Sequence, residues 1–278
     1  MELTESGRLV LAVFSFILGS MVGSFLNVCV HRIPQGLSVV KPRSRCPKCE
    51  TPIAWYDNLP MLSWLILGAK CRKCGLPISW QYPLVEAITG ALFLAVYWRF
   101  GLVAATPIYM AFVASMVLVT FVDLTDWTIP NEVTFPGIPI GVALAVAGLY
   151  FPESGLLLGG PIEAMIAGFA GGAFLYLLDK AALLLLGKRG MGFGDVKLIA
   201  MVGTFFGYKG VIVTIIIACF AGSIIGIAMI LLTPKKEGEE SAGHYLPFGP
   251  YLAAGAVLHL FFGPQLVELY LSTLTPAI

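Results

Sequence analysis

The 278-residue sequence is poor in charged residues, which make up 12% of it, whereas 58% of the residues are hydrophobic. Soluble domains usually carry about 25% charged residues, so this deficit excludes a water-soluble globular domain. The net charge is only +1. The sequence therefore lacks the excess of positive charge that would predict a nucleic-acid partner. Glu2 and Glu5 precede the first apolar run, where a cleaved signal peptide would carry Lys or Arg. This run is therefore expected to be a retained membrane anchor.

Long apolar runs take the place of the missing charge. They cover residues of about 9–30, 83–100, 103–122, 132–150, 161–186, 196–207, 211–232 and 251–271. A helix rises about 1.5 Å per residue and the hydrocarbon core of a bilayer is about 30 Å thick. The run 196–207 reaches only about 20 Å with its flanks, and we interpret it as a short crossing rather than a re-entrant segment. The sequence predicts an all-α polytopic membrane protein with about eight transmembrane helices.

Basic residues predict the orientation, because short loops rich in Lys and Arg stay in the cytosol. With the N-terminus outside, only Arg8, Arg99 and Lys209 fall in outer segments. The inner loops then hold Arg32, Lys41, Arg43, Arg45, Lys48, Lys70, Arg72, Lys73, Lys188, Arg189, Lys235 and Lys236. The basic residues of 41–48 and 70–73 also suit contact with anionic lipid headgroups. The loops that hold these basic residues are therefore expected at the cytosolic side of the bilayer.

One hydrophilic insertion, residues 31–82, holds two CxxC motifs. The motifs are Cys46-Pro-Lys-Cys49 and Cys71-Arg-Lys-Cys74. Four thiolates in two such knuckles suit a tetrahedral Zn²⁺, and the reducing cytosol disfavours disulfides. The pattern predicts a closed structural zinc site that folds this small insertion. The expected parts are thus a first transmembrane helix (1–30), a cytosolic zinc domain (31–82) and a transmembrane domain of about seven helices (83–278).

Two aspartates stand where predicted membrane helices end. Asp123 closes the third run and Asp195 opens the sixth, and both map to the cytosolic side. Ionisable residues are uncommon in membrane segments unless they have a function. Two neighbouring carboxyl groups that share one proton supply a base to activate water and an acid to polarise a peptide carbonyl. Asp123 and Asp195 are therefore the predicted catalytic pair of an aspartic protease.

The helix dipole suggests how this pair divides its work. The N-terminal end of a helix favours the carboxylate form of Asp195, and the C-terminal end favours the protonated form of Asp123. Our hypothesis makes Asp195 mainly the base and Asp123 mainly the acid, within a pair that titrates as a unit. Asp126 is a rival to Asp123, interpreted as a solvated loop carboxylate. Asp179 is interpreted as a structural partner of a neighbouring basic residue.

Glycines precede the second aspartate in the segment GMGFGDVK, residues 190–197. Glycine lets the backbone approach a ligand closely. Gly192 and Gly194, together with Lys197, are the candidate substrate-binding residues. The alternative is a flexible turn that ends in an N-capping aspartate.

With these motifs, the chain resembles the type IV prepilin leader peptidases, the bifunctional peptidase/N-methyltransferases of type IV pilus and type II secretion systems. The resemblance extends over nearly the whole chain. It rests on the paired CxxC motifs and on GSFLNVCVHRIP (23–34), QYPLVEAITG (81–90), Asp123-x₅-Ile129-Pro130-Asn131, GMGFGDVK (190–197) and LPFGPYLAAGA (246–256). The GxGD pattern is also similar to that of presenilin-type intramembrane proteases.

The resemblance implies an activity at the bacterial inner membrane. Such enzymes cut the basic leader of prepilins and pseudopilins on the cytosolic side, just after a glycine. Many then methylate the new N-terminal residue with S-adenosylmethionine. The catalytic aspartates of the family fall on Asp123 and Asp195. This chain has Thr125 where many members carry an acidic residue.

Two parts of this interpretation have alternatives. The insertion 31–82 lacks a GxGxxG loop that would bind the methyl donor, and His31, Asp57 and Glu86 are each interpreted as ordinary structural residues. Of these, Glu86 is expected to pair with a basic loop. The chain as a whole could instead be a proton- or cation-coupled transporter that uses its membrane aspartates, or a non-catalytic scaffold held by zinc.

Overall fold

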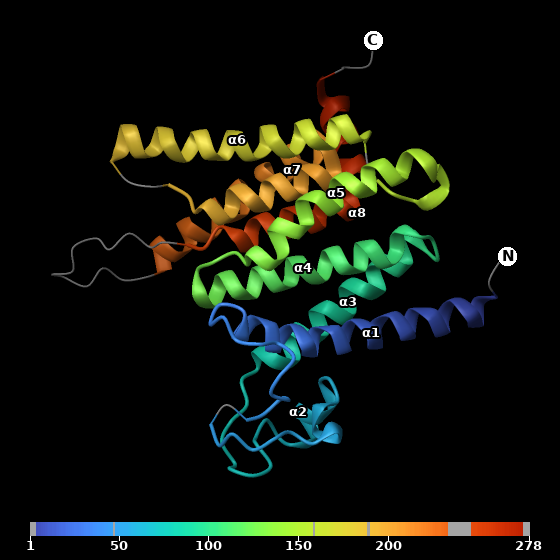
Figure 1. The fold of residues 1–278 in the computed structure, drawn as a ribbon, viewed down its shortest axis with the longest axis vertical. Helices are drawn as coiled ribbons and strands as arrows, with labels where there is room; N and C mark the ends of the chain where they lie inside the picture. Colours follow the sequence, from blue (N-terminus) through green and yellow to red (C-terminus); the bar gives the residue numbers. More distant parts are fainter. Residues whose placement is uncertain (1–3, 47, 158, 188–189, 233–245, 275–278) are drawn as a thin grey trace. The chain divides into compact units, whose positions relative to one another are not determined.

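The structure, a computed structural model, describes residues 4–46, 48–157, 159–187, 190–232 and 246–274. Within these ranges the chain is helical, without a β-strand beyond two isolated bridges (Figure 1). Among the described residues, seven helices are long and apolar enough to cross a membrane. The prediction of an all-α polytopic membrane protein is confirmed. Four basic residues of the orientation argument, Lys188, Arg189, Lys235 and Lys236, lie outside the described residues.

The chain divides into two compact units, residues 1–118 and 119–278. Helix α4 (Ala105–Asp126) begins in the first unit and ends in the second. Unit 1 contains α1 (Glu5–Arg32), η1 (Trp55–Asn58), α2 (Leu62–Ile66) and α3 (Gln81–Phe100). Unit 2 contains α5 (Asn131–Tyr150), η2 (Pro152–Ser154), α6 (Pro161–Leu186), α7 (Phe193–Leu232) and α8 (Gly249–Leu274).

Helices α1 and α3 of unit 1 pack through small residues. A Cβ at Gly19 would lie 2.7 Å from the carbonyl oxygen of Thr89, and one at Gly23 would lie 2.7 Å from the Cα of Glu86. Two glycines four residues apart let helix backbones approach closely in a membrane. The side chain of Asn27 adds a hydrogen bond to the Tyr82 carbonyl, 3.0 Å long.

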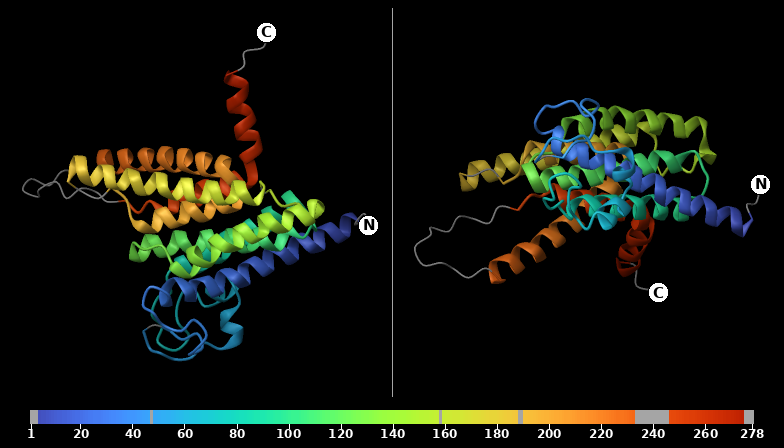
Figure 2. Two further views of the ribbon diagram at one scale, coloured as in Figure 1. Left: turned by 45° about the horizontal axis from the view of Figure 1, so that its top comes forward. Right: turned by 90° about the horizontal axis from the view of Figure 1, so that it is seen from below.

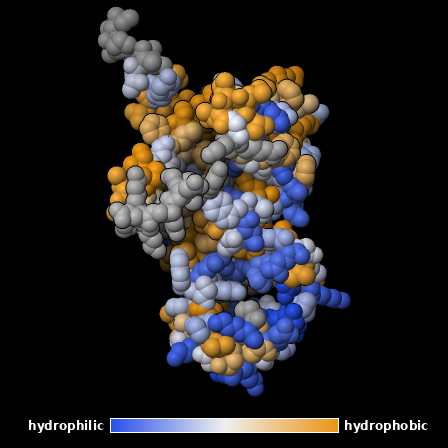
Figure 3. Space-filling view, turned by 90° about the vertical axis from the view of Figure 1, so that its left-hand side faces the viewer, coloured by the Kyte–Doolittle hydropathy of each residue, from blue (hydrophilic) through white to orange (hydrophobic). Residues whose placement is uncertain are grey.

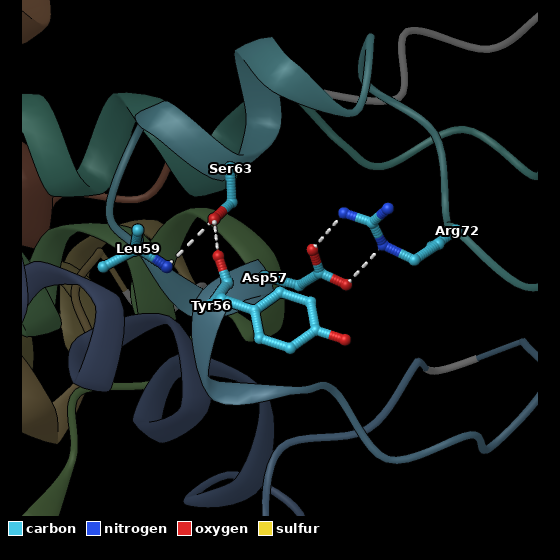
Figure 4. A network of polar contacts seen from close by, with 5 residues as sticks. All are labelled: Tyr56, Asp57, Leu59, Ser63 and Arg72. Carbon is cyan, nitrogen blue, oxygen red and sulfur yellow. Dashed lines mark hydrogen bonds and ion pairs between the residues drawn. The ribbon is translucent and has the colours of Figure 1, made fainter.

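The segment between α1 and α3 is held by polar contacts. The Ser63 hydroxyl accepts from the Leu59 N–H (3.0 Å) and donates to the Tyr56 carbonyl (3.1 Å) (Figure 4). Arg72 binds both carboxylate oxygens of Asp57, at 2.6 and 2.8 Å. In the space-filling view, hydrophilic residues gather over this segment, whereas apolar residues cover much of the visible helix surface (Figure 3). This segment is held together by hydrogen bonds and by its cluster of thiols rather than by a large apolar core.

Helix α7 is broken at Gly207, which has a non-helical φ of 65° and ψ of −166°. A Cβ at Gly171 of α6 would lie 3.0 Å from both the Cγ2 of Ile199 and the Cγ1 of Val211. In a straight helix these two residues, twelve positions apart, would be separated by about 18 Å. The chain therefore reverses at Gly207, and both ends of α7 lie toward the same side of unit 2 (Figures 1 and 2). The predicted runs 196–207 and 211–232 are the two arms of α7, which explains seven continuous helices in place of about eight.

Small residues also let the first arm of α7 pack closely in unit 2. A Cβ at Gly203 would lie 2.6 Å from the Ala167 carbonyl oxygen of α6. A Cβ at Gly137 of α5 would overlap the side chain of Met201. Because the first arm lies against both α5 and α6, the segment that begins with Asp195 has a fixed place in unit 2.

Candidate active site

Asp123 lies in the last turn of α4, and its side chain is buried, with 6% of its surface exposed. Its Oδ2 accepts a hydrogen bond of 3.0 Å from the backbone N–H of Gly249. Gly249 is the first residue of α8, so its N–H has no partner within its own helix. The start of α8 thus fixes one oxygen of a carboxyl group 126 positions earlier in the chain.

Asp195 lies in the first turn of α7 and is equally buried, with 6% exposed. Its Oδ2 accepts a hydrogen bond of 3.1 Å from the Gly192 N–H, and its own N–H donates to the Gly192 carbonyl at 3.2 Å. These reciprocal bonds close a tight turn at the helix start. One oxygen of each aspartate is therefore held by a backbone N–H.

Ile129 connects the surroundings of the two aspartates. A Cβ at Gly194 would lie 2.9 Å from the Ile129 Cβ, and one at Gly249 would lie 3.2 Å from the Ile129 Cδ1. One buried isoleucine thus touches the residue before Asp195 and the residue that binds Asp123. The structure brings the two aspartates, 72 residues apart, to one place in unit 2.

This geometry changes the dipole argument for acid and base. The hypothesis considered only the C-terminal end of α4 beside Asp123. The structure adds the N-terminal end of α8, whose Gly249 N–H favours a carboxylate at the same group. Because both aspartates now face a helix N-terminus, the dipoles no longer separate an acid from a base.

Asp126 is exposed and lies outside this arrangement. Its Oδ2 accepts a hydrogen bond of 2.8 Å from the hydroxyl of Thr125, which also donates to the Phe121 carbonyl at 2.9 Å. The interpretation of Asp126 as a solvated carboxylate agrees with this position.

Gly192, Gly194 and Lys197 lie beside Asp195, and their role in substrate binding stays a prediction. The glycine at 194 is needed for the close approach to Ile129, as described above. The Lys197 ammonium donates to the side-chain oxygen of Asn131, at the start of α5. It also lies 5.1 Å from the ring centroid of Phe135. Lys197 therefore ties the start of α7 to the start of α5.

The four predicted metal ligands come together in unit 1. The Sγ atoms of Cys46, Cys49, Cys71 and Cys74 all lie within 4.8 Å of one another. The pairs Cys46–Cys74 and Cys49–Cys71 are each separated by 4.0 Å. A tetrahedral Zn²⁺ with bonds of about 2.3 Å places its sulfur atoms about 3.8 Å apart. The donor set and its spacing fit a zinc ion.

The two knuckles have the same backbone hydrogen bonds. The N–H of each first cysteine donates five residues ahead, from Cys46 to Thr51 at 3.0 Å and from Cys71 to Leu76 at 2.9 Å. Glu50 and Gly75, which follow the second cysteines, both have positive φ. The described residues of the two knuckles therefore share one pattern of backbone hydrogen bonds and one positive φ after the second cysteine.

The electrostatics of the thiols also suit a cation. The hydroxyl and N–H of Thr51 lower the pKa of Cys49 to about 6. The Leu76 N–H acts to lower the pKa of Cys74, but burial and the neighbouring thiols outweigh it and raise this pKa to about 11. Four thiolates this close repel one another, and a bound dication removes that repulsion.

The candidate methyl-donor residues are each explained by their own surroundings. His31 is exposed at the end of α1, and Asp57 is paired with Arg72, which lowers the pKa of Asp57. Glu86 was expected to pair with a basic loop, but its Oε2 accepts from the backbone N–H of Met61 at 2.7 Å instead. These residues do not identify a binding site for S-adenosylmethionine.

Asp179 has two backbone partners among the described residues. Its Oδ1 accepts hydrogen bonds from the N–H groups of Gly190 and Met191, each 3.2 Å long. Among the described residues, no ion pair joins it to Lys180, and Arg189 lies outside them.

Sequence analysis did not assign Gly249 and Ile129 to the site, although both belong to motifs that carried the resemblance. The Gly-Pro pair that opens α8 is a signal for a helix start. Nothing in the sequence says, however, which distant carboxyl group that start faces.

Comparisons with known proteins show what both parts of the chain are similar to. The family described as the Bacterial Peptidase A24 N-terminal domain matches residues 17–100, and the Type IV leader peptidase family matches residues 110–227. Three similar proteins carry the name Prepilin leader peptidase/N-methyltransferase. The protein from Myxococcus xanthus is 39% identical over 85% of this chain and 70% of its own length. The proteins from Aeromonas salmonicida and Pseudomonas aeruginosa are 34% and 31% identical, over 93% and 98% of this chain and 93% and 97% of their own lengths.

No solved structure gives a significant match to the chain. The relatives give no support to a transporter. Both halves of the chain match in order, and the similarity extends over most of its length, so the chain belongs to the type IV leader peptidase family.

Proposed function

We propose that this protein is an aspartic endopeptidase that removes the basic leader of prepilins or pseudopilins, cutting just after a glycine at the cytosolic face of the bacterial inner membrane. The names of its relatives support this substrate class. The observation that carries the proposal is the meeting of Asp123 and Asp195 around Ile129, with one oxygen of each held by a backbone N–H.

The chemistry follows from two carboxyl groups that share one proton. The ionised carboxyl takes a proton from a water molecule as the water oxygen attacks the scissile carbonyl carbon. The protonated carboxyl gives its proton to the carbonyl oxygen. When the C–N bond breaks, the carboxyl that took its proton from the water gives it to the leaving amine. The other carboxylate takes a proton from a hydroxyl of the tetrahedral intermediate, and the pair returns to its starting state with one proton. Asp123 and Asp195 supply both groups, and neither is assigned permanently as acid or base.

The orientation belongs to the same proposal. Basic residues concentrate in the insertion 31–82, which places that insertion in the cytosol. The N-terminus then lies outside, and an odd number of membrane crossings separates it from the insertion. The reversal of α7 at Gly207 supports two crossings between Asp195 and residue 232, which keeps both of these positions on the cytosolic side.

Zinc would be held by Cys46, Cys49, Cys71 and Cys74, where it would join the two knuckles by four covalent contacts. Such a closed site is structural. Methylation of the new N-terminus from S-adenosylmethionine is proposed from the names of the relatives alone, and no step is derived for it.

Mass spectrometry of a prepilin incubated with the purified protein tests the proposal. We expect a product cut after the leader glycine, and one additional methyl group when S-adenosylmethionine is present. A substrate whose leader glycine is replaced by a large residue should stay uncut. An intact wild-type substrate, or a cut at another bond, would contradict the peptidase proposal.

A further inference from the structure

The loop between α6 and α7 is held from two sides by carboxylates. Three consecutive N–H groups face them: those of Gly190 and Met191 bind Asp179 at 3.2 Å, and that of Gly192 binds Asp195 at 3.1 Å. The first two donors thus bind a residue of α6, about two turns before its end, and the third binds the proposed catalytic residue on α7. The direction of the Gly192 N–H, and with it the place of the Asp195 oxygen, depends on the peptide units before it.

These peptide units have little stiffness of their own. Glycine occupies positions 190, 192 and 194, and glycine allows more backbone conformations than any other residue. Gly190 also packs near Ala182, because a Cβ placed on Gly190 would lie 3.3 Å from the Cβ of Ala182. Hydrogen bonds to a charged carboxylate are stronger than those between neutral groups. Asp179 is therefore the main polar restraint on the described part of this loop before Asp195.

A pocket of about 190 Å³ lies along the same loop. Asp179 and Gly192 both line it, together with Tyr176, Lys180, Met191, Phe193 and Val196. The Lys180 ammonium lies 5.3 Å from the centre of the Tyr176 ring, on the α6 wall. Because the loop has open space on this side, packing alone does not hold residues 190–192 in place, and the carboxylate of Asp179 does.

We propose that Asp179 is a positioning residue for the peptidase reaction, which holds Gly190 and Met191 so that the Gly192 N–H keeps Asp195 in its productive place. This inference rests on the proposed function. Asp179 acts through the loop and touches neither the substrate nor the reacting water. Loss of its carboxylate should lower kcat and leave KM nearly unchanged, because a displacement of about 1 Å at a reacting group costs about 100-fold in rate.

Cleavage kinetics of Asp179→Ala and Asp179→Asn test this role. We expect Asp179→Ala to lower kcat by about 10- to 100-fold with KM within about twofold. Asp179→Asn keeps an acceptor oxygen in the same place and should recover most of that loss. Glu153→Gln, at an exposed glutamate of η2, is the matched control and should behave as wild type.

Three results would overturn the inference. Asp179→Ala might cleave at the wild-type rate, it might change KM alone, or Asp179→Asn might be as slow as Asp179→Ala. If Asp179→Ala does not fold, the kcat of Asp179→Asn decides, and a value below a tenth of wild type would contradict the positioning role. A wild-type protein that leaves the prepilin intact in the same assay would count against the proposed function instead.

Discussion

Gly249 has no room for a side chain. A Cβ there would lie 2.6 Å from the Oδ2 and 3.0 Å from the Cγ of Asp123, and 3.2 Å from the Cδ1 of Ile129. Real Cβ atoms do not approach other atoms this closely, so an alanine would displace the carboxyl group of Asp123. The role of Gly249 is therefore steric as well as that of a hydrogen-bond donor.

Gly249→Ala should lower kcat for leader cleavage by about 10- to 100-fold, because the Asp123 carboxyl leaves its place beside Asp195. Gly222→Ala is the matched control, since its Cβ would make only ordinary contacts, with Tyr251 at 3.6 Å and Phe248 at 3.9 Å. Steady-state cleavage of a prepilin peptide measures both variants. Wild-type kcat in Gly249→Ala would show that Asp123 does not need its present position.

The residues of the site differ in how easily they can be identified from the sequence. Asp123, Asp195 and the four cysteines are unusual for their surroundings, either as acids at the ends of apolar runs or as thiols in regular pairs. Gly249 and Asp179 are not unusual in this way. Their importance comes from contacts with backbone or side chains that only the folded chain brings near.

At the scale of elements, the break in α7 joins a short helix to a longer one. Gly207 has a φ of 65° and a ψ of −166°, a combination that glycine adopts easily and residues with a side chain rarely do. The sequence predicted two runs here from hydropathy and charge. They were interpreted as two successive crossings with Lys209 outside, which requires a reversal between them. The place of the break was not readable, because a single glycine in an apolar run is also compatible with a continuous helix.

Labelling of single cysteines tests this reversal. In intact cells, Lys209→Cys should react with a membrane-impermeant maleimide, because the turn after Gly207 faces outward in the proposed orientation. Lys41→Cys in the insertion should react only after permeabilisation, and the parental chain gives the background. Protection of Lys209→Cys in intact cells would mean that the first arm of α7 does not cross.

The two knuckles are elements that depend on a metal. Purified protein should contain about one zinc per chain, and Cys71→Ser should lose it and be cut faster by trypsin within residues 31–82, because metal binding is coupled to folding. Cys219→Ser, far along the chain in α7, should keep the metal. Metal analysis and limited proteolysis read out both effects. Full zinc in Cys71→Ser would refute the four-cysteine site.

At the scale of the whole molecule, the sequence predicted the fold class and the residues of the site better than their arrangement. Apolar runs identify the membrane helices because a bilayer requires about 20 apolar residues per crossing. The domain boundaries at residues 30 and 82 stay a prediction. The structure divides the chain into two compact units, 1–118 and 119–278. Glycine contacts such as Gly203 against Ala167 were not predictable, since they depend on which helices become neighbours.

The central claim is that Asp123 and Asp195 act as one catalytic pair, and cleavage rates of their asparagine variants test it most directly. We expect Asp123→Asn and Asp195→Asn each to lower kcat by at least about 1000-fold, with the double variant no slower than the slower single one, because either loss disables the same unit. Asp126→Asn should cleave at close to the wild-type rate. Substantial activity in either single variant, or a double variant slowed by the product of the two single effects, would contradict the account.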